Sequence, residues 1–191
     1  MRFFSLFIVL FLFLFNHPHP LLSESGEIDG VYYEFNHVDS CYSFRGSFVI
    51  KAEFDCLISV LYDFKHLKNF ISSAHSIILI QQGENWYDVC YTFKKFFFTN
   101  KSIYRKTLKL EEQKIVFKMI SNRQNTNLFP KVLSSSGYYR IKCESTGYAI
   151  EYFQECKIKS TFLKNMYIKK AKKESTKFML ELKEYVERTC H

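Results

Sequence analysis

Glycine and proline are scarce in this sequence, with 6 and 3 occurrences in 191 residues. This scarcity excludes a collagenous chain and a low-complexity chain rich in these residues. Tryptophan occurs once, whereas phenylalanine occurs 21 times and tyrosine 13 times. Apolar residues form 47% of the chain, which excludes an intrinsically disordered protein. The length allows one ordinary domain, large enough to bury a core of its own.

The sequence also lacks the motifs that identify common enzymes and metal proteins. It contains no G-x-G or Gly-Lys-Ser/Thr phosphate loop and no G-x-S-x-G nucleophile turn. After residue 25, the histidines are scattered and form neither H-x-H nor H-E-x-x-H, and no C-x-x-C occurs. We therefore expect no cofactor and no metal, and we assign no catalytic residue.

An apolar segment opens the chain. Residues 3–15 are apolar except for one serine, and a single arginine precedes them. Ser23-Glu24-Ser25 places small residues at the −3 and −1 positions of a cut before Gly26, which is typical of a secretory signal. The apolar run is shorter than the about 20 residues of a membrane span. We expect residues 1–25 to be a signal peptide and the mature protein to be secreted or periplasmic; the alternative is an uncleaved short anchor.

Hydrophobic periodicity predicts an α+β domain over residues 41–191, after a flexible lead-in over residues 26–40. Apolar residues recur at three- and four-residue steps over residues 53–71, which predicts two short helices, and over residues 162–188, which predicts a long C-terminal helix. Short turns join most of the strand-like segments, so we expect an antiparallel sheet. The seven segments with strand periodicity are 41–51, 75–82, 86–95, 101–110, 114–121, 135–143 and 148–158.

The last two predicted strands form a hairpin around the turn 144–147. If residue 143 pairs with residue 148, every second residue on each strand shares one face of the sheet. The side chains on that face would be Tyr139, Ile141, Cys143, Tyr148, Ile150 and Tyr152.

The order of one strand, two helices, six strands and a long helix resembles that of the START-like helix-grip superfamily. This superfamily includes the birch-pollen-allergen, lipid-transfer and polyketide cyclase groups. The segment Gly46–Phe70 (GSFVIKAEFDCLISVLYDFKHLKNF) is similar to the family's opening, with Ala52 at a small-residue position and Asp63 at the recurring Asp. The segment Lys172–Glu187 (KKESTKFMLELKEYVE) is similar to its closing helix. The resemblance covers about residues 41–189 and lacks the proline common after the small residue.

The resemblance implies a curved seven-stranded antiparallel sheet that grips the C-terminal helix, with a cavity between them. Such cavities are lined mainly by apolar and aromatic side chains. Each candidate is also compatible with simple core packing, so the prediction concerns the set. The residues expected to line the cavity are Phe44, Phe48, Tyr91, Phe93, Phe117, Met119, Tyr139, Ile141, Ile150, Tyr152, Phe178 and Leu182.

The six cysteines permit fifteen pairings, and export favours oxidation. In the family the first and last strands are neighbours, which implies that Cys41 lies near Cys156. The closing helix returns toward the first helix, which implies that Cys190 lies near Cys56. The other two cysteines would be left unpaired.

The net charge is +8, and it survives removal of the leader. A solvated basic face is one interpretation, and attraction to an anionic membrane surface is the other. The segment Phe96–Phe98 beside the basic residues would insert into a membrane, gate a cavity or be buried. Nucleic acid is not expected as a partner of an exported protein. The basic groups are Lys94, Lys95, Lys101, Arg105 and Lys106 in the central hairpin, and Lys164, Lys169, Lys170, Lys172 and Lys173 in the last helix.

The leading hypothesis is an exported, monomeric protein that binds a hydrophobic or amphipathic small molecule of lipid type in this cavity. One alternative is a cyclase- or dehydratase-type enzyme that uses the same cavity, with Arg45, Arg105, Arg140 or His75 as its polar group. A second alternative is a protein-interaction module with a filled cavity.

Overall fold

The computed structural model describes residues 22–127, 129–159 and 161–190. In this part of the chain, nine strands form one antiparallel sheet in the order β1-β2-β3-β9-β8-β7-β6-β5-β4. The helices are α2 (Phe54–Tyr62), α3 (Phe64–Phe70) and α4 (Lys164–Thr189), and the short 3₁₀ helix η1 (Leu110–Glu112) joins two strands. The strands are β1 (Leu22–Ile28), β2 (Val31–Val38), β3 (Cys41–Ile50), β4 (Ser76–Gln82), β5 (Trp86–Lys95), β6 (Phe98–Lys109), β7 (Lys114–Gln124), β8 (Val132–Glu144) and β9 (Gly147–Ile158).

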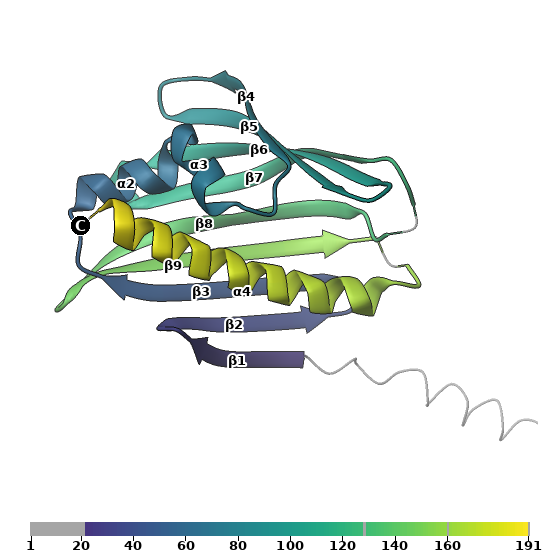
Figure 1. Ribbon diagram of the computed structural model, residues 1–191, viewed down its shortest axis with the longest axis horizontal. Helices are drawn as coiled ribbons and strands as arrows, with labels where there is room; N and C mark the ends of the chain where they lie inside the picture. Colours follow the sequence, from purple (N-terminus) through teal and green to yellow (C-terminus); the bar gives the residue numbers. More distant parts are fainter. Residues whose placement is uncertain (1–21, 128, 160, 191) are drawn as a thin grey trace, which may run out of the picture.

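The helices cover one face of the sheet (Figure 1). We call this face the inner face and the opposite one the outer face. Helix α4 packs against β2, β3, α2 and α3. It does so through an apolar stripe at helical spacing, formed by Met179, Leu182 and Val186, each of them fully buried. No helix in the described ranges is both long and apolar enough to cross a membrane.

The strand count differs from the prediction because two further strands precede β3. Residues 26–40 contain the last three residues of β1 and all of β2, so they are not the flexible lead-in that we expected. Asp29 and Gly30 form the turn between these strands with φ values of 50° and 74°, the conformation that two-residue hairpin turns require. Val31 and Phe35 of β2 are buried in the core. The signal peptide predicted over residues 1–25 lies outside the described residues up to residue 21.

Two predictions about long-range and local pairing are confirmed. Hairpin β8–β9 has the expected register, in which residue 143 pairs with 148, 141 with 150 and 139 with 152. Cys56 and Cys190 form a disulfide that ties the first turn of α2 to the end of α4. The disulfide joins residues 134 positions apart in the sequence, so it fastens the first of these helices to the last.

Candidate functional site

The inner face of the sheet carries the aromatic residues expected to line a cavity. Strand pairing is continuous from β3 through β9, β8, β7, β6 and β5, and it places all ten predicted strand residues on this face. Phe178 and Leu182 of α4 pack over them. That any of these residues contacts a ligand stays a prediction. The strand residues are Phe44, Phe48, Tyr91, Phe93, Phe117, Met119, Tyr139, Ile141, Ile150 and Tyr152.

An aromatic cluster occupies the centre of the inner face. The ring centroid of Tyr152 lies 5.1 Å from that of Tyr139, 5.7 Å from that of Phe117 and 5.0 Å from that of Phe178 on α4. Burial raises the pKa of Tyr139 and Tyr152 well above the ordinary value for tyrosine, so both hydroxyls stay neutral. The cluster therefore forms an apolar, uncharged surface.

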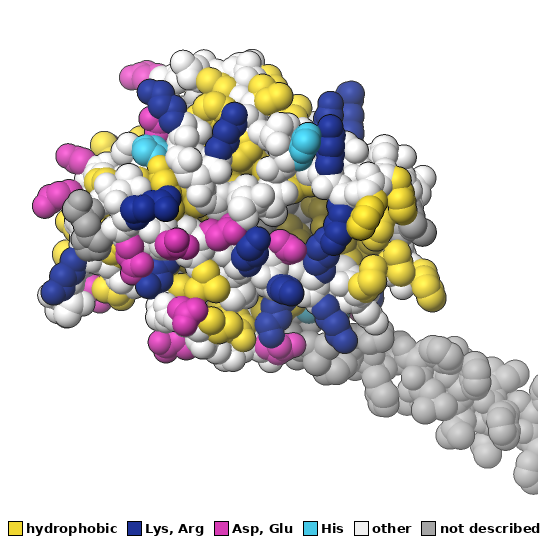
Figure 2. Space-filling model, viewed as in Figure 1, with side chains coloured by type: hydrophobic (Ala, Val, Ile, Leu, Met, Phe, Trp, Pro, Cys, Tyr) yellow, Lys and Arg dark blue, Asp and Glu magenta, His cyan; other side chains and the backbone are white. Residues whose placement is uncertain are grey.

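Helix α4 does not cover this surface uniformly. It packs against β2 and β3, and it lies away from β4–β6 (Figure 1). On the β5–β7 side the inner-face side chains of Phe93, Tyr104 and Met119 are only half-buried. Figure 2 shows a recess with apolar side chains between α4 and this part of the molecule. This part of the inner face is therefore less covered by α4 than the part over β2 and β3.

One charged side chain also lies on the inner face. Lys106 of β6 is 3% exposed, and its Nζ lies 4.9 Å from the ring centroid of Tyr139. Burial lowers the pKa of Lys106 to about 7. The sequence grouped Lys106 with surface lysines, and this prediction is wrong. Successive residues of a strand point to opposite faces, so Arg105 is on the outer face and Lys106 is inside.

A buried polar network lies toward the β3 side. Ser135 Oγ accepts hydrogen bonds from Gln154 Nε2 at 2.9 Å and from Cys156 Sγ at 3.3 Å. Tyr42 is hydrogen-bonded to Cys156 and to Tyr167 of α4. Burial raises the pKa of the Cys156 thiol, so it stays protonated. This network satisfies its own members and holds the start of α4 on the sheet.

The four polar residues considered for an enzyme do not reach the inner face. Arg45, Arg105 and Arg140 lie on the outer face by strand pairing, and His75 is exposed before β4. Arg105 donates two hydrogen bonds to Asp88, at 2.8 and 3.0 Å, and these lower the pKa of that carboxyl. Within the described ranges no group of three or more His, Cys, Asp or Glu side chains is placed to hold a metal.

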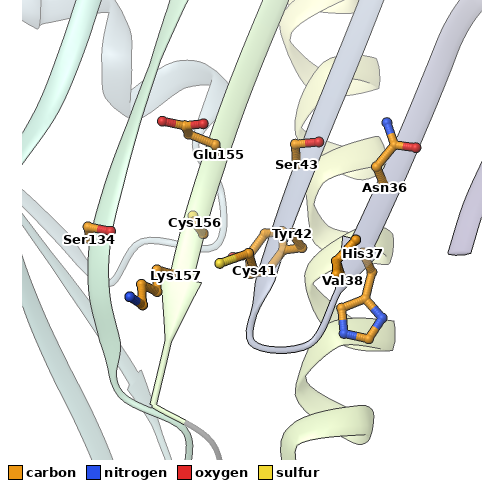
Figure 3. Close-up of a pocket in the computed structure, with 10 residues that line it drawn as sticks. All are labelled: Asn36, His37, Val38, Cys41, Tyr42, Ser43, Ser134, Glu155, Cys156 and Lys157. Atoms are coloured by element: carbon orange, nitrogen blue, oxygen red, sulfur yellow. The ribbon is translucent and has the colours of Figure 1, made fainter. Parts of the chain in front are cut away.

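The predicted pairing of Cys41 with Cys156 is wrong. Both cysteines are free, because Cys41 lies opposite Lys157 in the sheet while Tyr42 lies opposite Cys156. An offset of one residue puts the two side chains on opposite faces. Cys41 is exposed and Cys156 is buried, and both border a depression of about 380 Å³ at the ends of β2, β3 and β9 (Figure 3).

A second depression, of about 850 Å³, lies on the outer face over β6–β9. Arg105, Ile120 and Tyr138 are among the residues that line it. It is wide and open to solvent, and it lies on the side of the sheet away from α4. Phe117 and Met119, whose side chains belong to the inner face, also border it.

The β5–β6 hairpin ends in an exposed aromatic turn. Phe96 and Phe97 form its two-residue turn and are 94% and 65% exposed, whereas Phe98 packs on Phe129 with ring centroids 5.0 Å apart. At the same end of the sheet, Phe162 in the segment between β9 and α4 is almost fully exposed, and Met166 in the first turn of α4 is about half exposed. We call these four exposed residues, Phe96, Phe97, Phe162 and Met166, the aromatic end.

Comparison with known proteins identifies the fold. No family model and no curated protein sequence matches the chain. Among solved structures, it is similar to the STAR-related lipid transfer protein of Xanthomonas axonopodis (TM-score 0.67, 11% identity, 87% of this chain and 98% of that one). It is also similar to human StAR-related lipid transfer protein 5 (TM-score 0.65, 9% identity, 96% of this chain and 94% of that one). A third similar structure is the Zhui aromatase/cyclase of Streptomyces sp. R1128 (TM-score 0.64, 12% identity, 78% of this chain and 94% of that one). The chain has the START-like helix-grip fold.

Proposed function

We propose that this protein is an exported, monomeric carrier that binds a hydrophobic or amphipathic molecule of lipid type between the sheet and α4. The observation that carries the proposal is the aromatic inner face, which α4 leaves partly uncovered on the β5–β7 side. Each Å² of apolar surface that a ligand buries there contributes about 25 cal/mol. Two of the similar structures are named lipid transfer proteins, which supports the same use of the fold here.

Export is part of this proposal. A disulfide such as Cys56–Cys190 persists in oxidising compartments, which supports a secreted or periplasmic location. The apolar leader over residues 3–15 supports it from the sequence.

The aromatic end supports loading from an anionic membrane. Residues 89–110, 114–143 and 156–173, which contribute to this end of the molecule, contain no Asp or Glu, and the β2–β3 turn at the same end contains Asp39. Lys94 and Lys95 directly precede the exposed turn at Phe96 and Phe97. Each basic residue near an anionic membrane surface contributes about 1 kcal/mol of attraction. Exposed aromatic side chains flanked by lysines suit the interface between head groups and acyl chains.

Ligand binding is tested by native mass spectrometry of the mildly purified protein. We expect a co-purifying lipid-type molecule on the wild type. Met119→Trp fills the inner recess and should lower the bound fraction, whereas Lys118→Trp, which lies opposite Arg105 on the outer face, should not. A wild-type protein that carries no ligand and takes up none from vesicles would contradict the proposal.

Membrane docking is tested by co-sedimentation with vesicles of phosphatidylcholine, with and without phosphatidylserine. The wild type should bind the anionic vesicles, and Phe96→Ser with Phe97→Ser should lower binding several-fold. The matched control is Ile78→Ser with Ile80→Ser, which removes two exposed apolar side chains from β4. Equal losses in both double variants would refute docking through the aromatic end.

A further inference from the structure

Two buried polar atoms, on neighbouring residues of the inner face, have no hydrogen-bond partner among the described residues. They are Lys106 Nζ and Tyr87 OH. These residues lie directly opposite each other on β6 and β5, so their side chains rise side by side from the sheet. More than nine in ten buried polar groups in proteins are hydrogen-bonded, and an unpaired buried ammonium is among the costliest exceptions. The pair therefore requires an explanation.

The surroundings of this pair are mainly aromatic faces, and the charge of Asp63 contributes to the raised pKa of Tyr87. Lys106 lies over the ring of Tyr139, and Phe117 lies opposite Lys106 on β7. The rings of Tyr62 and Phe64, from α2 and α3, lie 5.3 and 6.5 Å from that of Tyr87. Burial alone lowers the pKa of Lys106, with no carboxylate opposing it. The site thus presents N–H donors from Lys106, an O–H donor from Tyr87 and an apolar wall, and a bound carboxylate would keep the amine of Lys106 protonated.

We propose that the ligand is an amphipathic carboxylate of the fatty-acid class, whose carboxylate accepts hydrogen bonds from Lys106 Nζ and Tyr87 OH. This inference rests on the proposed function and names its ligand class. A carboxylate has two acceptor oxygens and one negative charge, which match the two donors and the single cation. A zwitterionic phospholipid head group fits less well, because it is bulky and its own positive charge would meet a lysine.

In this proposal the acyl chain of the ligand lies along β6 on the inner face. From Lys106 to Phe98 at the hairpin turn, β6 spans eight residues, or about 26 Å at 3.3 Å per residue. This exceeds the about 15 Å that the acyl chains of one bilayer leaflet occupy. Val89, Tyr91 and Met119 flank the first half of this path on the inner face, and the hydrogen-bonded side chains of Asn100, Ser102 and Asn122 lie along its second half. The head group would lie deep in the protein, and the chain would extend toward the aromatic end.

The test compares oleic acid with oleyl alcohol, which share the same chain and differ in the head group. Affinities of the delipidated protein are measured at pH 7.5 by displacement of a fluorescent dye. The wild type should bind the acid at least about tenfold more tightly than the alcohol, because hydrogen bonds to charged groups are strong in a buried site. Lys106→Met should remove this preference and leave alcohol binding within twofold. Tyr87→Phe should reduce the preference in part.

Lys118→Met is the control, because Lys118 is exposed on the outer face of β7. This variant should prefer oleic acid over oleyl alcohol as strongly as the wild type does. Equal binding of acid and alcohol by the wild type, or a preference that persists in Lys106→Met, would overturn the inference and leave the proposed function standing. Binding of neither ligand would instead overturn the proposed function, and the carboxylate assignment with it.

Discussion

Replacing Lys106 by methionine should stabilise the ligand-free protein by an amount that depends on pH. The side chains have similar length, so the change removes the buried amine with little change in packing. The pKa of Lys106 is lowered from 10.5 to about 7 in the folded protein. Between these values the unfolded chain binds the extra proton, so wild-type stability rises with pH by about 1.4 kcal/mol per pH unit. Below pH 7 the penalty is constant, at about 5 kcal/mol for the shift of about 3.5 units.

These values set the expected difference between the two proteins. At pH 7.5 the penalty of the buried amine is about 4 kcal/mol, and at pH 9.5 it falls to about 1.4 kcal/mol. Lys106→Met should therefore be more stable than the wild type by about 4 kcal/mol at pH 7.5 and by about 1.4 kcal/mol at pH 9.5.

Urea unfolding at these two pH values measures the difference directly. Lys118→Met is the matched control, because it removes an exposed lysine from the neighbouring strand, and its stability should follow that of the wild type at both pH values. If Lys106→Met and the wild type differ by the same free energy at pH 7.5 and pH 9.5, the amine is solvated or paired in the folded state. That result would refute the description of the inner face given above.

Three further predictions concern the disulfide, the packing of the sheet and the N-terminus of the exported protein. Cys56→Ser should lower the free energy of unfolding by about 2–5 kcal/mol, because the disulfide closes a long loop; Cys143→Ser, at an exposed free cysteine, should change it little, as thermal melts will show. Gly137→Ala should destabilise the sheet by about 2 kcal/mol or more, because its Cβ would lie 2.0 Å from a backbone oxygen of β9; a normal urea midpoint would be the contrary outcome. The exported protein should begin at Gly26, with β1 shortened to Gly26–Ile28, and N-terminal sequencing of the secreted form checks this; an intact leader would favour the uncleaved anchor.

Hairpin β1–β2 shows how a local signal was missed. Asp29-Gly30 is a strong signal for a two-residue turn, and the apolar positions Val31, Tyr33 and Phe35 alternate after it. The polar composition around them led to a prediction of irregular structure. Val31 and Phe35 are buried because β2 pairs with β3 and packs against α4. Helix α4 is far away in the sequence, so a local pattern of residues does not reveal this contact.

The sequence by itself determined the periodicity of the seven later strands, the two short helices and α4, and the register of β8–β9, since all of these depend on residues close in the chain. The pairing of Cys56 with Cys190 followed from the resemblance of the whole element order to a known fold. Only the tertiary structure decided that Lys106 is inside and that Cys41 and Cys156 face apart. A period of two requires neighbouring side chains to point to opposite faces, but pairing across strands and the position of α4 determine which face is buried.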